Sequence, residues 1–329
     1  MDLGHYQLYK DMKRYLSIFL KGFGMGAANV VPGVSGGTIA LITGIYNELI
    51  STLKSFNLKS FKLLIRLEFK KLFIQLNLVF LITLFTGAVV GIFSLGKLFK
   101  WIIDLERNVN GKSIEHGYEP VLFALFFGLI LSSVYFVGVK IKNWNLGSIF
   151  SSLIGCALAI LLVLIKPGSE NDQSLFLFFC GIIAMSSMLL PGLSGSFVLI
   201  LLGNYYLIMI ESVQNFDIYV LSLVGLGAFV GFLILSNLIS YLLNNYESLT
   251  LSSLTGFIFG SLATIWPWKT IVREEVIKGN EIKEVIIGYE NWTYPAFNSF
   301  DMLLILFILI GFFMVFGFEK FGSYLKSEN

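Results

Sequence analysis

The sequence predicts an all-α polytopic membrane protein made of two inverted repeats, each a re-entrant helical hairpin plus three transmembrane helices. Three observations predict this fold. The 329 residues are 56% hydrophobic and 13% charged, with a mean hydropathy of +0.80, which excludes an ordinary soluble domain. Uncharged apolar runs follow one another along the chain. One proline-glycine motif occurs twice inside them, as V-P-G-V-S-G-G at residues 31–37 and as L-P-G-L-S-G-S at residues 190–196.

The apolar runs give the expected membrane segments, and most are close to the ~20 residues that a helix needs to cross a hydrocarbon core of about 30 Å. The run at 175–210 is too long for one helix, and Pro191 and Gly192 lie near its centre. Each arm of about 16 residues reaches only ~24 Å, so we expect a hairpin that dips to mid-membrane and returns to the same side. The runs are 22–47, 78–96, 121–139, 147–165, 175–210, 218–243, 248–268 and 302–318.

The distribution of charge favours re-entrant hairpins at both motifs. With both hairpins re-entrant and the N- and C-termini cytoplasmic, the cytoplasmic segments carry 14 of the 23 basic residues and only seven of the 21 acidic ones. This agrees with the excess of Lys and Arg on the cytoplasmic side of membrane proteins. If the first hairpin crossed the membrane once instead, the six basic residues of segment 54–71 would lie outside, against this rule.

Matching motifs indicate an internal duplication, with repeats at 1–165 and 166–329. The matches keep their order while the offset falls from 159 to 140 to 132, because the first repeat has longer connections. Three spans is an odd number, so the second repeat enters the membrane from the opposite side, as in inverted-repeat transporters. The matched segments are 31–36 with 190–195, Gly44-x-Tyr46 with Gly203-x-Tyr205, 87–91 with 227–231, and 127–128 with 259–260.

Each repeat also has a segment outside the membrane. The first repeat has its hairpin at about 16–50. Segment 51–77 follows, in which Lys and Arg alternate with apolar residues as in a basic amphipathic helix on an anionic cytoplasmic surface. The second repeat has its hairpin at 175–210. At about 270–290, apolar β-branched residues flank a turn at 278–280, which predicts an external β-hairpin.

The two motifs are the predicted binding site. Proline ends one half-helix, glycine permits a tight turn, and small hydroxyl residues begin the next half-helix. Free N–H groups at a helix start suit an anion such as phosphate. The alternative is that the motifs are only packing breaks whose serines cap the half-helices. The candidate residues, including two asparagines that flank the breaks, are Asn29, Pro32, Gly33, Ser35, Gly36, Gly37, Thr38, Pro191, Gly192, Ser194, Gly195, Ser196 and Asn204.

Other small and polar residues have simpler explanations. Glu48 and Glu211 end the returning arms and are expected to be interface residues rather than proton carriers, which leaves any coupling ion unassigned. With two cysteines and two histidines, the chain is expected to have no disulfide, metal or cofactor site, and no nucleic-acid partner. Gly-x-x-x-Gly patterns, typical of closely packed helix faces, begin at Gly22, Gly87, Gly227 and Gly256.

The two motifs, with the Gly-Ile-Tyr and Gly-Asn-Tyr that follow them, resemble those of a family of prokaryotic integral membrane proteins, the PopT-type polyprenyl-phosphate transporters. The resemblance covers nearly the whole chain. It implies a flippase of the bacterial plasma membrane that returns undecaprenyl phosphate from the outer to the inner leaflet, so that this carrier lipid is used again in cell-envelope synthesis. It also implies that the polyprenyl-phosphate lipid binds at the two motifs, and we expect transport by alternating access.

A second resemblance gives an alternative. Membrane undecaprenyl-pyrophosphate phosphatases also use inverted re-entrant hairpins, with a P-G-x-S-R-S type motif and nearby glutamates. This chain has Gly36 and Gly195 at the arginine position, and no glutamate-rich motif in its apolar runs. It therefore lacks a cation to hold a pyrophosphate and a carboxylate to transfer a proton. We expect no enzymatic activity. A phosphatase-like enzyme, or a small-anion carrier or channel, remains the alternative.

Overall fold

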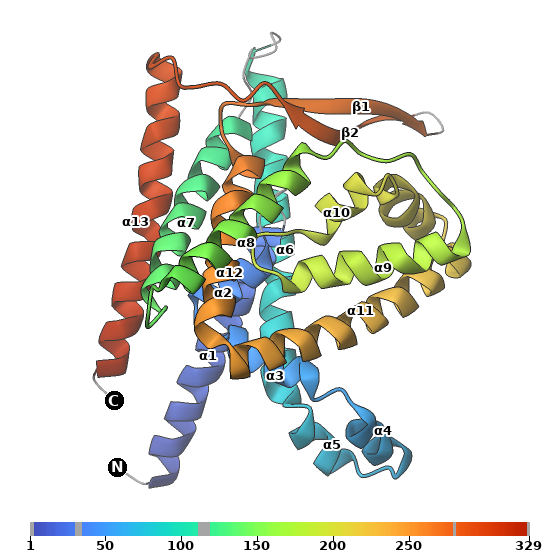
Figure 1. Ribbon diagram of the computed structural model, residues 1–329, viewed down its shortest axis with the longest axis vertical. Coiled ribbons are helices and arrows are strands. Elements are labelled where there is room, and N and C mark those ends of the chain that lie inside the picture. The colour runs from blue at the N-terminus through green and yellow to red at the C-terminus, as the bar shows by residue number, and fades with distance from the viewer. Residues whose placement is uncertain (1–2, 30–34, 111–118, 279–280, 328–329) are drawn as a thin grey trace.

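The computed structural model describes residues 3–29, 35–110, 119–278 and 281–327, which form a helical bundle with a β-hairpin at one end (Figure 1). The predicted first repeat, 1–165, covers α1 (Leu3–Asn29), α2 (Gly36–Ile42), α3 (Tyr46–Lys54), α4 (Leu58–Ile65), α5 (Phe69–Gln75), α6 (Leu78–Asn110), α7 (Glu119–Val139) and α8 (Leu146–Leu164). The predicted second repeat, 166–329, covers α9 (Ser174–Leu189), α10 (Gly195–Leu201), the π-helix η1 (Tyr206–Ser212), α11 (Ile218–Asn245), α12 (Glu247–Ser261), the 3-10 helix η2 (Leu262–Ile265), β1 (Thr270–Lys278), β2 (Glu281–Glu290) and α13 (Ser299–Ser327).

Among the described helices, six are long and apolar enough to cross a membrane, three in each repeat. They are α6, α7 and α8, then α11, α12 and α13. The prediction of a helical multi-pass membrane protein is confirmed, and these six helices agree in number with the predicted spans. Of the apolar window of α12, 67% is buried, against 17–44% for the other five. α12 is therefore the most enclosed of the six, packed against α7, α8 and α11.

Close helix pairs form the bundle: α1 packs on α6, α9 on α11, α7 on α13 and α8 on α12. Glycines lie at these contacts. A Cβ at Gly22 would lie 2.1 Å from the carbonyl oxygen of Leu84, and a Cβ at Gly256 would lie 1.8 Å from that of Ser152. Side chains do not fit in such spaces, so the helix backbones touch each other. All four Gly-x-x-x-Gly patterns lie at these pair contacts, as predicted.

The glycine contacts follow the offsets of the sequence duplication. In the first repeat, Gly87 of α6 faces the carbonyl oxygen of Phe19 of α1, and in the second, Gly227 of α11 faces that of Phe178 of α9. The two glycines are separated by the offset of 140 and the two phenylalanines by the offset of 159. Equivalent helices therefore pair through equivalent residues.

The helical segment that follows each motif is itself broken at a glycine, which corrects the expectation of one continuous half-helix there. Gly44 follows α2 and Gly203 follows α10, with φ of +75° and +77°. The residue after each glycine donates its N–H to the carbonyl oxygen five positions back, of Ala40 and Leu199. This is the Schellman arrangement, which ends a helix at glycine. As a result α10 and η1 meet at a bend of 115°.

Two further bounds differ from the expected ones. α1 is 27 residues long and begins at Leu3, well before the expected hairpin start near residue 16. Segment 51–77 forms the end of α3 and the short helices α4 and α5, separated by Leu67 at a φ of 55°, rather than one amphipathic helix. Apolar side chains of α4 and α5 are exposed, including Leu58 and Ile74. Their contact with an anionic membrane surface stays a prediction.

The predicted β-hairpin is present. β1 and β2 pair in antiparallel fashion, with a bulge between Val272 and Arg273. The hairpin lies across the end of the bundle opposite to α4 and α5 (Figure 1). Tyr289 of β2 is buried and stacks on Phe197 of α10, with ring centroids 6.5 Å apart. The β-hairpin therefore packs beside the second proline-glycine motif.

Candidate functional site

The two proline-glycine motifs meet in the structure, although about 155 residues separate them in sequence. The Ser35 hydroxyl donates a hydrogen bond to the carbonyl oxygen of Leu190 (3.2 Å), and the Gly192 N–H donates one to the Thr38 hydroxyl oxygen (2.8 Å). Ser35 and Thr38 are buried, at 1% and 0% exposure. The hydroxyl groups of the first motif thus bond the backbone of the second.

A tyrosine beyond the first motif adds to this junction. The Tyr46 hydroxyl donates to the carbonyl oxygen of Leu189 at 2.9 Å, and Tyr46 is only 2% exposed. Leu189 is the last residue of α9, where carbonyl groups have no partner within the helix. Tyr46 therefore satisfies an acceptor that the helix end leaves open. The Gly-x-Tyr matches contained this residue, but the sequence analysis gave it no role.

Ser35 and Ser194 cap the helices that follow the motifs. Ser35 Oγ accepts from the Gly37 N–H at 3.1 Å, and Ser194 Oγ accepts from the Phe197 N–H at 3.2 Å. Both serines have a φ of −112°, with ψ of 133° and 137°. These capping bonds are the ones expected if the motifs are only packing breaks whose serines cap the half-helices. Anion binding at these helix starts stays a prediction, because the capped N–H groups already have partners within the chain.

Asn29 closes the first break from the other side. Its Oδ1 atom accepts from the Gly36 N–H at 2.8 Å, so it joins the end of α1 to the start of α2. Pro32 and Gly33 lie outside the described residues.

The glycines of the second motif let separate segments come close together. Gly192 has a φ of +92°, and a Cβ there would lie 3.2 Å from the Cα of Ile258 in α12. A Cβ at Gly195 would lie 2.9 Å from the carbonyl oxygen of Ala184 in α9. A residue with a side chain does not fit at Gly195 without displacing α9 or α10. The second motif is thus enclosed between α9 and the central helix α12.

The second motif also presents hydroxyl groups at its surface. The Ser194 and Ser196 hydroxyl oxygens are 2.7 Å apart, and Ser196 is exposed while Pro191 is buried. Ser196 is therefore the candidate residue of this motif that is most accessible to a ligand.

Asn204 is bonded elsewhere. It is fully buried, its Oδ1 accepts from the Asn171 N–H (2.9 Å), and its Nδ2 donates to the Asn171 carbonyl oxygen (2.7 Å). These bonds hold the loop before α9 against the turn after α10. A cavity-lining role for Asn204 stays a prediction, and the observed contacts are those of a structural residue.

Two lysines lie beside the arms, one in each repeat. Lys140 follows the end of α7, and its Nζ donates to the carbonyl oxygen of Ile42 at the end of α2 (2.9 Å). Lys269 follows α12 and η2. Its Nζ donates to the carbonyl oxygen of Thr264 and lies 4.3 Å from the ring centroid of Phe123 and 4.0 Å from that of Tyr289. Tyr289 in turn stacks on α10, so Lys269 lies near the second motif.

Lys269 is not among the residues predicted from the sequence. It lies in a polar connection after α12, and of the two rings around it, Phe123 of α7 is far away in sequence while Tyr289 of β2 comes 20 residues later. One signal in the sequence could have indicated it. The offset of 132 matches α12 with α7, and a lysine follows each of these helices: Lys269 after α12 and Lys140 after α7. Lys140 thus bonds the end of α2 directly, whereas Lys269 reaches α10 only through Tyr289.

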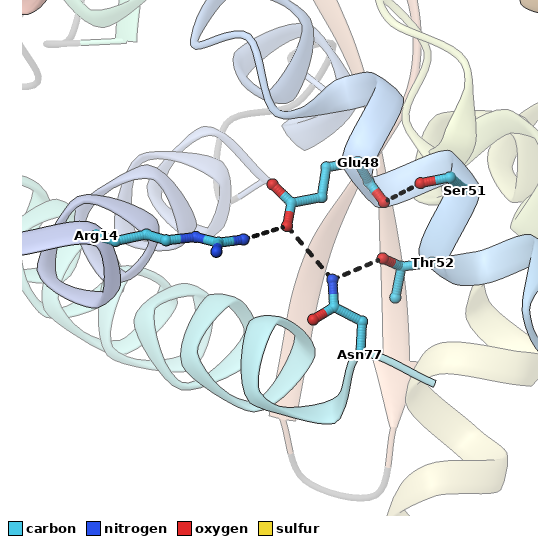
Figure 2. Close-up of polar contacts among 5 residues, drawn as sticks. All are labelled: Arg14, Glu48, Ser51, Thr52 and Asn77. Carbon is cyan, nitrogen blue, oxygen red and sulfur yellow. Dashed lines mark hydrogen bonds and ion pairs between the residues drawn. The ribbon is translucent and has the colours of Figure 1, made fainter. Parts of the chain in front are cut away.

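A polar network ties the first returning arm to its neighbours (Figure 2). Glu48 of α3 forms an ion pair with Arg14 of α1 at 3.0 Å. Asn77, just before α6, donates to Glu48 Oε1 and to Thr52 Oγ1, both at 3.3 Å. The Ser51 hydroxyl donates to the backbone carbonyl of Glu48 at 2.9 Å. Glu48 thus joins α3 to α1 and α6, as the expected interface residue would.

Glu211 of η1 belongs to an acidic group. Burial, together with the nearby charges of Glu211 and Asp172, raises the pKa of Glu170 in the loop before α9. Like charges at close range disfavour ionisation, so this loop and the π-helix repel each other when all three groups are charged.

The structure defines a polytopic membrane protein in which two broken segments, distant in sequence, meet between membrane-length helices. The chain belongs to the undecaprenyl phosphate translocase-like family, which matches residues 25–282. This confirms the family expected from the motifs.

Two relatives are similar to most of the chain. One is the polyprenyl-phosphate transporter of Vibrio cholerae serotype O1, which is 35% identical over 313 residues, covering 94% of this chain and 97% of the relative. Another is the polyprenyl-phosphate transporter of Staphylococcus aureus, which is 34% identical over 266 residues, covering 75% of this chain and 85% of the relative. No solved structure matches the chain.

Proposed function

We propose that the protein returns undecaprenyl phosphate from the outer to the inner leaflet of the bacterial plasma membrane, so that the carrier lipid is used again in envelope synthesis. The observation that carries this proposal is the family match over most of the chain, with two relatives named polyprenyl-phosphate transporters. The junction of the two motifs supports it, because irregular backbone inside a membrane protein is tolerated where it is covered by protein or lines a cavity.

The glycine contacts support an inverted-repeat transporter. Gly87 with Phe19 and Gly227 with Phe178 are the same contact in two halves. In inverted-repeat transporters, the substrate lies where two such halves meet and the halves move against each other. We infer that the two motifs form this central region and that transport is by alternating access.

The arrangement of the ends supports the charge-based topology. The start of α1, the end of α13, and the helices α4 and α5 lie at one end of the molecule, and the β-hairpin lies at the opposite end (Figure 1). Segment 51–77 holds the basic residues expected on the cytoplasmic side. The proposed orientation has both termini and α4–α5 in the cytoplasm and the β-hairpin outside.

Lys140 and Lys269 are positively charged side chains that could attract the phosphate headgroup in this proposal. In the proposed orientation Lys140 lies toward the cytoplasm and Lys269 toward the outside. A phosphate is attracted to either ammonium group, which is a compact point charge. Lys269, which contacts Tyr289 next to Phe197 of α10, would receive the headgroup from the outer leaflet, and Lys140 would meet it after transfer.

Leaflet exchange of labelled undecaprenyl phosphate in proteoliposomes tests the proposal. Wild-type protein should accelerate exchange over empty vesicles, and Lys269→Gln and Ser196→Ala should slow it. Lys166→Gln is the matched control, because Lys166 is an exposed lysine of the loop before α9. Absence of protein-dependent exchange under every ion gradient applied would refute transport. Release of phosphate from lipid pyrophosphate by the same preparation would instead indicate the phosphatase alternative.

A further inference from the structure

A groove of about 540 Å³ lies between α7, α8 and α12. Its lining is mostly apolar and includes Val134, Leu153, Cys156 and Phe259. The volume is within the roughly 300–1,000 Å³ range of small-molecule binding sites. Tyr135, Leu153 and Phe259 on its lining are more than half exposed, so the groove opens at the side of the bundle.

Small residues create this groove. A Cβ at Gly256 would lie 1.8 Å from the carbonyl oxygen of Ser152, so α8 and α12 meet backbone to backbone along its floor. At Gly138 of α7 a Cβ would make ordinary van der Waals contact with Trp144, at 3.6 Å, and with Thr255, at 3.9 Å, so glycine keeps the lining thin at this point. The Trp144 indole N–H donates to the Gly138 carbonyl oxygen at 3.1 Å and fixes one rim.

The equivalent place in the other repeat is filled. The offset of 132 makes Val134 of the groove equivalent to Trp266, and Phe259 of the groove equivalent to Phe127. Phe127 and Trp266 pack edge to face with ring centroids 5.4 Å apart. By sequence equivalence, the second half has an indole where the first half has the smaller valine. Close packing of the helices alone does not explain why one half has tryptophan and the other valine at this position.

One rim of the groove carries positive charge. Lys140 and Lys142 flank the lining residue Ile141, and Lys142 forms an ion pair with Glu247 at 3.2 Å. Lys140 is also bonded to the end of α2, the short helix that begins at the first motif. An apolar slot next to cationic groups is complementary to a lipid with a hydrocarbon tail and an anionic head.

We propose that this groove holds the part of the prenyl chain next to the phosphate of a polyprenyl-phosphate lipid whose headgroup lies at the Lys140 end. This deepens the proposed function and rests on it. In the second half, Trp266 fills the position that corresponds to the groove. We therefore expect the lipid tail to leave the protein only through the groove, on the side of Lys140. The tail stays in contact with apolar surface while the headgroup moves through the centre of the protein.

Val134→Trp tests the groove, because it copies the residue that fills the equivalent place. The new indole would pack on Phe259 as Trp266 packs on Phe127. Binding of radiolabelled undecaprenyl phosphate to purified protein should weaken about tenfold or more, since buried tail contacts are lost. Leu158→Trp on the exposed side of α8 is the control and should bind like wild type. Wild-type affinity in a folded Val134→Trp protein would overturn the inference.

Cys156 gives a second measurement that needs no substitution in the groove. The chain has two cysteines, and Cys180 is buried at 1% exposure, so a membrane-permeant maleimide should label Cys156 in the folded protein. Undecaprenyl phosphate and undecaprenol, which has the tail without the phosphate, should both protect it, whereas inorganic phosphate should not. Equal protection by phosphatidylglycerol would overturn the inference, because the groove would then hold any membrane lipid.

The two proposals can fail separately. Tight wild-type binding of undecaprenyl phosphate, with no effect of Val134→Trp and no protection of Cys156, would reject the groove and leave transport standing. Protection of Cys156 by undecaprenol without leaflet exchange would support the groove and reject transport.

Discussion

The Gly192 N–H donates to Thr38 Oγ1 at 2.8 Å, which joins the second proline-glycine motif to the first at a buried point. In this bond the second motif is the donor. In the bond from the Ser35 hydroxyl to the Leu190 carbonyl oxygen, the first motif is the donor. Each motif thus donates one hydrogen bond to the other. The junction depends on both, because a buried donor or acceptor without a partner is costly.

Thr38→Val should destabilise the protein by about 1–3 kcal/mol, because valine keeps the shape of threonine but leaves the Gly192 N–H without its acceptor. Thr38→Ser keeps the hydroxyl and should cost less. The thermal unfolding midpoint of detergent-purified protein measures the difference. Equal stability of the valine and serine variants would show that the bond between the motifs contributes nothing.

Gly227→Ala should destabilise the pair formed by α9 and α11, because the new Cβ would lie 2.0 Å from the carbonyl oxygen of Phe178. Overpacking of this kind costs about 1–3 kcal/mol. Gly225→Ala, two residues away on the same helix, is the matched control, since a Cβ there would meet no described atom within 4 Å. Gly225→Ala should be neutral or slightly stabilising. The same loss in both variants would point to backbone effects of glycine and away from helix contact.

The Arg14–Glu48 ion pair should contribute little to stability. The side chains are 61% and 35% exposed, and exposed pairs are worth about 0–1 kcal/mol because water and salt screen them. A double-mutant cycle with Arg14→Ala and Glu48→Ala should give a coupling energy in this range that falls as salt increases. Asn77→Ala should cost more than Arg14→Ala, because Asn77 bonds both Glu48 and Thr52. A large, salt-independent coupling would contradict this account.

Glu170→Gln should stabilise the protein at neutral pH and have no effect in acid. The folded-state pKa of Glu170 is raised by burial and by Glu211 and Asp172, so folding favours its protonated form. That favourable contribution is present at low pH and is lost as pH rises past the normal range of a carboxyl group. Glutamine removes the charge at every pH. Unfolding midpoints at pH 4 and pH 8 should therefore differ less in the variant than in the wild type.

The sequence predicted the six membrane-length helices and the pairing glycines because these depend on local composition and regular spacing. It did not predict the second break in each arm, although Gly44 and Gly203 were within the matched motifs. A glycine can mark the end of a helix, but in a long apolar run no change in hydrophobicity accompanies it, so the helix end is not recognised. Other contacts depend on how helices distant in sequence pack together. Examples are the contact between Ser35 and Leu190 and the rings around Lys269. The spacing of residues in one sequence does not predict such packing.

The glycine contacts within the helix pairs also restrict how the molecule can move. Where backbone touches backbone, as at Gly22 with Leu84, no side chain can change its rotamer to let one helix slide past its partner. Contacts within the pairs are far more extensive than those between them. Each pair therefore behaves as a stiff two-helix rod. In the proposed alternating-access cycle, we expect opening toward either leaflet to tilt whole rods, with the bends after Gly44 and Gly203 as hinges.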